Sequence, residues 1–247
     1  MPYPDIEQFR ADNGYDIEGV WYPRVTAIVG IKAKPALYRF YAGHKSFAAA
    51  EAMKEKSAEE GTLIHELAEG ILAGHSPTIP DQWSPLIDAF KNFLQQHEII
   101  PRSIEQKIVS KKHGYAGTID VLADVDGKIG VLDIKTSQAI YRDYGIQTAA
   151  YVEALHEEPT MPPLARWILR LDQVRLCMNG CGGRMRDKGG VEKVRNAFPY
   201  RPCQHVWGAP VGDIELKELG NLEHDTQAFL ASKTLWEWEN AEVLAQI

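Results

Sequence analysis

The spacing of apolar residues predicts mostly helices in the first third of the chain. Residues 45–57 are rich in Ala, Lys and Glu, and residues 59–73 place Leu63, Leu67 and Ile71 four positions apart. A third helix is predicted over residues 82–97, where large apolar side chains recur at helical spacing. Ahead of these helices, the β-branched and proline-containing segment 21–31 predicts a strand.

From residue 104 the pattern changes to strands. Three apolar segments, 104–111, 117–124 and 128–135, predict strands, and Asp126-Gly127 between the last two predicts a tight hairpin turn. A helix is predicted over residues 144–155, followed by two pairing strands at 166–173 and 213–219. The last helix carries a stripe that is predicted to face the core, formed by Leu222, Phe229, Trp236 and Val243. The whole pattern predicts an α/β fold.

Composition and net charge exclude several classes of protein. The 247 residues are 45% hydrophobic and 25% charged, an ordinary globular composition, and we expect a single domain over residues 1–247. The net charge of −7 argues against binding nucleic acid through overall positive charge, so such a site would have to be a local patch. The sequence shows neither a basic, apolar leader nor about 18 consecutive apolar residues. We therefore expect a cytoplasmic protein with no membrane partner.

The predicted hairpin brings ionisable side chains together. If Asp126 and Gly127 form the turn, Asp120 and Asp133 are cross-strand neighbours, and strand alternation puts Lys135 on the same face. Two adjacent carboxylates repel one another unless a hard divalent cation such as Mg²⁺ lies between them. The alternative is that both carboxylates face solvent and Lys135 is their ion-pair partner. The apolar character of the two strands argues for the first interpretation, because a buried unpaired carboxylate is costly.

Gly117-Thr118-Ile119-Asp120, then Asp133-Ile134-Lys135 and Gln147-x-x-x-Tyr151, resembles the PD-(D/E)xK nuclease superfamily, in particular its RecB-type exonuclease branch. The resemblance covers residues 21–155 and implies a restriction-endonuclease-like core with a mixed central sheet flanked by helices. An aspartate, Asp133, stands where glutamate is the commoner residue of the motif.

The resemblance also implies roles for residues. The metal ligands would be His65, Asp120, Asp133 and the backbone carbonyl of Ile134, which together would hold one or two Mg²⁺ or Mn²⁺ ions. Lys135 would activate water, Glu105 would complete the catalytic group, and Gln147 and Tyr151 would contact the DNA or brace the site. The implied function is metal-dependent hydrolysis of DNA, with an exonuclease favoured and a recombination or replication protein as a possible partner. The sequence leaves strandedness, polarity and oligomeric state open.

Two other functions remain open at this point. A protein that keeps this fold but has lost catalytic activity would serve as a DNA-binding or adaptor module. The intact Asp120, Asp133 and Lys135 argue against this alternative. The sequence HELAE at 65–69 also resembles the zinc-peptidase pattern, but the second histidine that the pattern requires is missing.

Residues 175–211 interrupt the late hairpin and contain all three cysteines. Cys177, Cys181, Cys203 and His205 match the ligand set of a structural zinc ion in a small zinc-knuckle-like insertion, with three unrelated thiols as the alternative. The insertion also carries a basic stretch that could follow phosphates or simply be a solvated loop, formed by Arg184, Arg186, Lys188, Lys193, Arg195 and Arg201.

Overall fold

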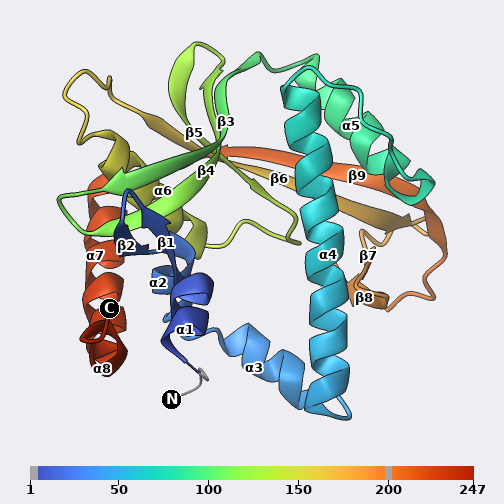
Figure 1. Ribbon diagram of the computed structural model, residues 1–247. Coiled ribbons are helices and arrows are strands. Elements are labelled where there is room, and N and C mark those ends of the chain that lie inside the picture. The colour runs from blue at the N-terminus through green and yellow to red at the C-terminus, as the bar shows by residue number, and fades with distance from the viewer. Residues whose placement is uncertain (1–4, 198–201) are drawn as a thin grey trace.

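A mixed sheet forms the centre of the fold (Figure 1). The computed structural model describes residues 5–197 and 202–247, and Arg201 of the basic stretch lies outside them. The sheet has seven strands among the described residues, and its path begins with β3 (Ile99–Ser110), β4 (Tyr115–Val125), β5 (Lys128–Lys135) and β6 (Ala165–Cys177). β5 and β6 are parallel, whereas the other pairs are antiparallel. The predicted α/β class with a mixed central sheet is therefore confirmed.

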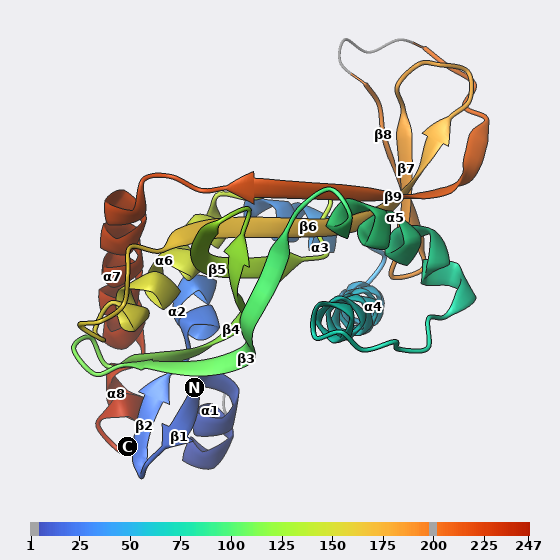
Figure 2. The ribbon, with the colours of Figure 1, turned by 90° about the horizontal axis from the view of Figure 1, so that it is seen from above.

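Long β6 carries partners on both edges. Antiparallel β9 (Trp207–Glu218) pairs along most of its length, as predicted for the late hairpin. Beyond the end of β5, β6 pairs briefly with β7 (Arg184–Lys188), which forms a second hairpin with β8 (Val191–Arg195). Figure 2 shows this small hairpin projecting away from the main sheet.

Helices cover both faces of the sheet (Figure 2). One face packs against α2 (Val25–Gly30), α6 (Asp143–Leu155) and α7 (Leu222–Glu239), and the other against α4 (Phe47–Leu72) and α5 (Ser84–Leu94). The remaining elements are α1 (Ile6–Asn13), β1 (Gly14–Ile17), β2 (Val20–Pro23), α3 (Pro35–Ala42), the 3₁₀ turn η1 (Asp81–Trp83) and α8 (Ala241–Leu244). Each face therefore has its own hydrophobic core.

The C-terminal stripe faces one of these cores, as predicted. Phe229, Trp236 and Val243 are buried, and Leu222 packs against them at the edge. Trp236 stacks on Phe9 of α1 with ring centroids 6.0 Å apart. The end of the chain thus fastens the N-terminal helix to the sheet.

Two predicted elements differ from the structure. The strand expected over residues 21–31 ends at Pro23, and the helix α2 follows, because Val25 and Ile28 are spaced to bury one helical face completely. The two helices expected over 45–57 and 59–73 form the single helix α4. Gly61 does not break it; a Cβ there would lie 2.9 Å from Thr136 Oγ1, so glycine lets the helix approach the sheet closely.

A buried arginine joins β6 to two helices. Arg166 is 1% exposed, donates to the carbonyl oxygen of Gly145 at 2.8 Å and forms an ion pair with Asp225 at 3.0 Å. Removing one partner of such a pair leaves the other charge buried and uncompensated. We expect Arg166→Ala to lower the free energy of unfolding by about 3–5 kcal/mol, measured by urea denaturation. A change below about 1 kcal/mol would contradict the expectation, and exposed Arg102→Ala is the matched control.

Candidate metal and nucleic-acid site

The candidate site lies where β4 and β5 separate. The predicted hairpin register is confirmed from Val125↔Lys128 to Val121↔Leu132, and the β4–β5 ladder ends one pair before Asp120 and Asp133. Instead of facing a partner across the ladder, Asp120 accepts a hydrogen bond from the backbone N–H of Ile134 at 2.7 Å. Its carboxylate therefore fills the space between the diverging strands.

Asp133 and Lys135 form an ion pair in the interior. Asp133 is fully buried, and its Oδ2 lies 2.5 Å from Nζ of Lys135, whose side chain is 18% exposed. Burial raises the pKa of Asp133 to about 6; Lys135 opposes this rise, and the charge of Asp120 adds to it. The sequence places these groups together, and the structure brings them within contact of one another.

His65 reaches the same point from α4. Its Nε2 lies 2.8 Å from the carbonyl oxygen of Ile134 and 3.4 Å from Asp120 Oδ2, and its Nδ1 lies 2.8 Å from Glu69 Oε1. Burial lowers the pKa of His65, but the hydrogen bond to Glu69 and the charge of Asp120 outweigh burial and raise it to about 9. The imidazolium form donates from both nitrogens.

These groups form a donor set that fits a hard cation. Ligand atoms of His65, Glu69 and Asp120 all lie within 4.8 Å of one another, and the carbonyl oxygen of Ile134 faces the same point. Carboxylate and carbonyl oxygens are the ligands of Mg²⁺, and imidazole suits transition metals such as Mn²⁺. A proton on Nε2 lies between two acceptors, the Ile134 carbonyl and Asp120, where a cation held by these groups would lie, so metal binding requires the loss of this proton.

Glu105 lies on β3 opposite Asp120. Ladder pairs on either side, Ile104↔Val121 and Gln106↔Ile119, fix this position. Its backbone has a left-handed φ of 51°, which is unusual for a residue other than glycine. Burial and the neighbouring carboxylate of Glu69 raise the pKa of Glu105. Glu105 thus stands beside the donor set, where a carboxylate is electrostatically unfavourable without a cation.

Gln147 braces Asp133. Its Nε2 donates to Asp133 Oδ1 and to the hydroxyl oxygen of Tyr151, both at 3.0 Å. Tyr151 is 2% exposed, and a Cβ at Gly117 would lie 2.6 Å from its ring, so glycine provides the space for it. Because the Tyr151 ring is buried, it supports Gln147 from the interior and cannot contact DNA.

An open groove gives access to the donor set. It has a volume of about 590 Å³ and runs between α4 and the end of β5. The residues around it include Ser57, Gly61, His65, Glu69, Glu105, Lys135 and Thr136. An extended polymer can therefore reach the candidate metal ligands.

The small hairpin is attached to this site through Thr136. Arg186 and Lys188 of β7 donate to the carbonyl oxygen of Thr136 at 2.7 and 2.6 Å. Gly189 follows with a φ of +68°, and a Cβ there would lie 2.8 Å from the carbonyl oxygen of Met53. The hairpin therefore makes two contacts near the site. Its turn packs against α4, and its strand β7 binds Thr136, the residue that follows Lys135.

Cys177, Cys181, Cys203 and His205 converge in the insertion, with ligand atoms within 4.8 Å of one another. The sulfurs of Cys177 and Cys203 are 3.8 Å apart, and Cys181 Sγ lies 3.4 Å from His205 Nδ1. Two sulfurs held at about 2.3 Å from a tetrahedral zinc ion are separated by about 3.8 Å, whereas a disulfide requires about 2.05 Å.

Neighbouring groups form hydrogen bonds to two of the four Cys/His ligands, His205 and Cys181. His205 Nε2 lies 3.0 Å from Asn196 Oδ1, which favours a proton on Nε2 and leaves Nδ1 as the ligand atom. The backbone N–H of Gly183 donates to Cys181 Sγ at 3.3 Å. The four residues that the sequence indicates can therefore hold a metal ion.

The sequence prediction weighed Glu69 only as a substitute ligand in the zinc-peptidase pattern and did not place it in the nuclease site, and it missed the contacts of the small hairpin with Thr136. Glu69 follows His65 by four residues, so both lie on one helical face, and this spacing could have indicated it. The contacts of Arg186 and Lys188 depend on how the insertion folds back, for which the sequence offers no comparable signal.

Neither models of protein families nor curated protein sequences match this chain. Within the described part of the chain, each helix is too short or too polar to cross a membrane.

Proposed function

We propose that the protein is a metal-dependent nuclease that hydrolyses DNA phosphodiester bonds. The observation that carries the proposal is the placement of Lys135 and Asp133 beside the donor set of His65, Asp120 and the Ile134 carbonyl. A lysine, carboxylates and a cation site around one open groove suit an anionic substrate that is attacked by water.

Each residue has a role in this proposal. His65, Asp120 and the Ile134 carbonyl would hold Mg²⁺ or Mn²⁺, with Asp133 as a further ligand, and the bound cation would lower the pKa of water and polarise the phosphoryl oxygen. Lys135 orients the attacking water and offsets the negative charge that builds on the phosphoryl group. Gln147 holds Asp133 in place.

The fold and site further support a restriction-endonuclease-like core of the RecB type, and hence an exonuclease. In the same proposal the four ligands of the insertion hold a structural zinc ion. The peptidase alternative has less support, because the donor set of described residues around His65 contains a single histidine and lies next to Lys135, which is paired with Asp133. A catalytically silent module would bind DNA equally well with and without Mg²⁺.

Cleavage of end-labelled DNA tests the proposal. We expect linear DNA to be degraded in Mg²⁺ or Mn²⁺ and to survive without a divalent cation, and closed circles to survive in both conditions. Single-stranded and double-stranded forms of each substrate are compared. A preparation of the Lys135→Met variant, purified identically, controls for a contaminating nuclease.

The outcomes separate the alternatives. Cleavage of circles as well as linear DNA would support the nuclease and reject the exonuclease. DNA binding that is unaffected by Mg²⁺, with no cleavage of any substrate, would identify a binding module and overturn the proposal.

A further inference from the structure

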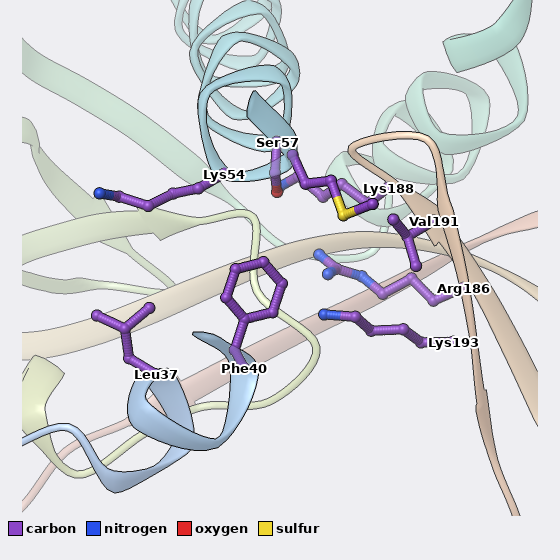
Figure 3. A pocket seen from close by; sticks show the side chains of 9 residues that line it. Leu37, Phe40, Lys54, Ser57, Arg186, Lys188, Val191 and Lys193 are labelled. Carbon is purple, nitrogen blue, oxygen red and sulfur yellow. The ribbon is translucent and has the colours of Figure 1, made fainter. Parts of the chain in front are cut away.

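A second pocket lies beside the groove, and the nuclease mechanism does not use it. α3, α4 and the β7–β8 hairpin enclose about 190 Å³ (Figure 3). Its lining combines apolar and cationic side chains: Leu37, Phe40, Met53, Lys54, Ser57, Arg186, Lys188, Val191 and Lys193. Ligand pockets for larger molecules are typically about 300–1,000 Å³, so this one suits a single small unit.

The pocket opens onto the groove of the candidate metal site. Ser57 lines both hollows. Lys188 lines the pocket and donates to Thr136, which lines the groove. A chain molecule with one phosphate at the donor set can therefore extend along α4 and place another of its units in the pocket.

The pocket carries positive charge that the described carboxylates do not fully balance. Arg186 is paired with Asp172 at 2.6 Å, and Lys54 with Glu51 at 3.2 Å. Among the described residues, no ion pair to a carboxylate is found for Lys188 or Lys193. Burial lowers the pKa of Lys188 to about 8, the charge of Arg186 adds to the decrease, and the carboxylates of Asp172 and Glu60 oppose it. An anionic group would be favourable here in a protein of net charge −7.

The apolar wall of the pocket supplies a ring for stacking. Phe40 belongs to α3, a helix in which no residue is buried. Nζ of Lys193 lies 5.0 Å from the centroid of the Phe40 ring, and Figure 3 shows Arg186 and Lys193 pointing toward Phe40 from the hairpin. Because the lysine stem is flexible, its ammonium can move to a phosphate and leave the ring face to a base.

We propose that this pocket is a nucleotide subsite, which holds one unstacked nucleotide of a DNA strand with its base on Phe40 and its phosphate on Lys193 and Lys188. The inference rests on the proposed nuclease function, and it makes single-stranded DNA, or a frayed end, the preferred substrate. Bases within a duplex are stacked and cannot reach such a ring.

Fluorescence anisotropy in Mg²⁺ tests the subsite, with all variants made in the Lys135→Met background so that labelled oligothymidylate stays intact. We expect Phe40→Ala to raise the Kd about tenfold, because stacking of one base contributes about 1–3 kcal/mol, and Phe40→Trp to restore the affinity. Lys193→Ala should weaken binding and reduce the slope of log K against log salt by about 0.7. Exposed Tyr38→Ala on α3 and Lys128→Ala on β5 are the matched controls and should bind normally.

Other outcomes overturn the proposal in distinguishable ways. In the first, Phe40→Ala and Lys193→Ala bind single strands normally while the wild-type protein, which keeps Lys135, cleaves DNA. This result would reject the nucleotide subsite and leave the proposed nuclease function supported. If dTMP binds in a Phe40-dependent manner and does not compete with the oligonucleotide, the pocket is a site for free nucleotides. If no DNA is bound or cleaved by any form, the nuclease function itself fails.

Discussion

Lys135→Met should reduce the rate of DNA cleavage by about 10³-fold without unfolding the protein. A positioned acid, base or cation typically contributes about 10²–10⁴-fold to a rate, and methionine preserves the length of the side chain without the ammonium. Asp133 loses its ion-pair partner, but Lys135 opposes the rise that burial causes in the pKa of Asp133, so its removal raises this pKa further and favours the neutral carboxyl, which needs no counterion. The measurement is single-turnover cleavage of labelled DNA in Mg²⁺.

Lys128→Met is the matched control. Lys128 begins the strand that Lys135 ends, and it pairs with Glu218 at the surface. We expect its rate to equal that of the wild type. Circular dichroism of both variants should be unchanged, and a Lys135→Met protein that cleaves within tenfold of the wild-type rate would rule out the role assigned to Lys135.

Cys203→Ser should reduce bound zinc from about one ion per chain to nearly none. Apparent binding free energies of structural zinc are about 10–16 kcal/mol in small finger peptides, so the ion can determine whether such a unit folds. Met185 is the one buried hydrophobic side chain of β7 and β8, which leaves the hairpin with little core of its own. Elemental analysis of the purified protein measures the metal directly.

Loss of this ion should also affect cleavage. Without an ordered hairpin, Arg186 and Lys188 no longer hold Thr136, so we expect the cleavage rate of Cys203→Ser to fall about tenfold. His224→Ala, an exposed substitution on α7, is the surface control and should keep both the zinc and the wild-type cleavage rate. Iron and sulfide in the wild-type protein, or full zinc in Cys203→Ser, would be incompatible with the assignment.

Periodicity and turn chemistry predicted much of this architecture. Asp126-Gly127 determined the register of the β4–β5 hairpin, because a two-residue turn leaves a single way to pair the strands. The seven-residue stripe ending at Val243 identified the core face of the last helices. Both signals are local, and the structure follows them.

The errors arose where distant contacts decide the local structure. The sequence predicted two helices, over 45–57 and 59–73, where the structure has the single helix α4, which approaches Thr136 closely at Gly61. Similarly, the β4–β5 ladder ends before Asp120, whose carboxylate accepts a hydrogen bond from the backbone N–H of Ile134. Neither contact can be inferred from spacing along the chain.

The uneven burial of α4 divides one helix into two regions of different local stability. Four of its five buried residues, Ile64, Leu67, Ala68 and Leu72, lie in the C-terminal third, next to His65. Amide hydrogens there should exchange only with global unfolding, whereas those around Met53 and Ser57 should exchange through local opening. The part of the helix that lines the pocket can therefore open and release a bound strand while the candidate metal ligands keep their positions.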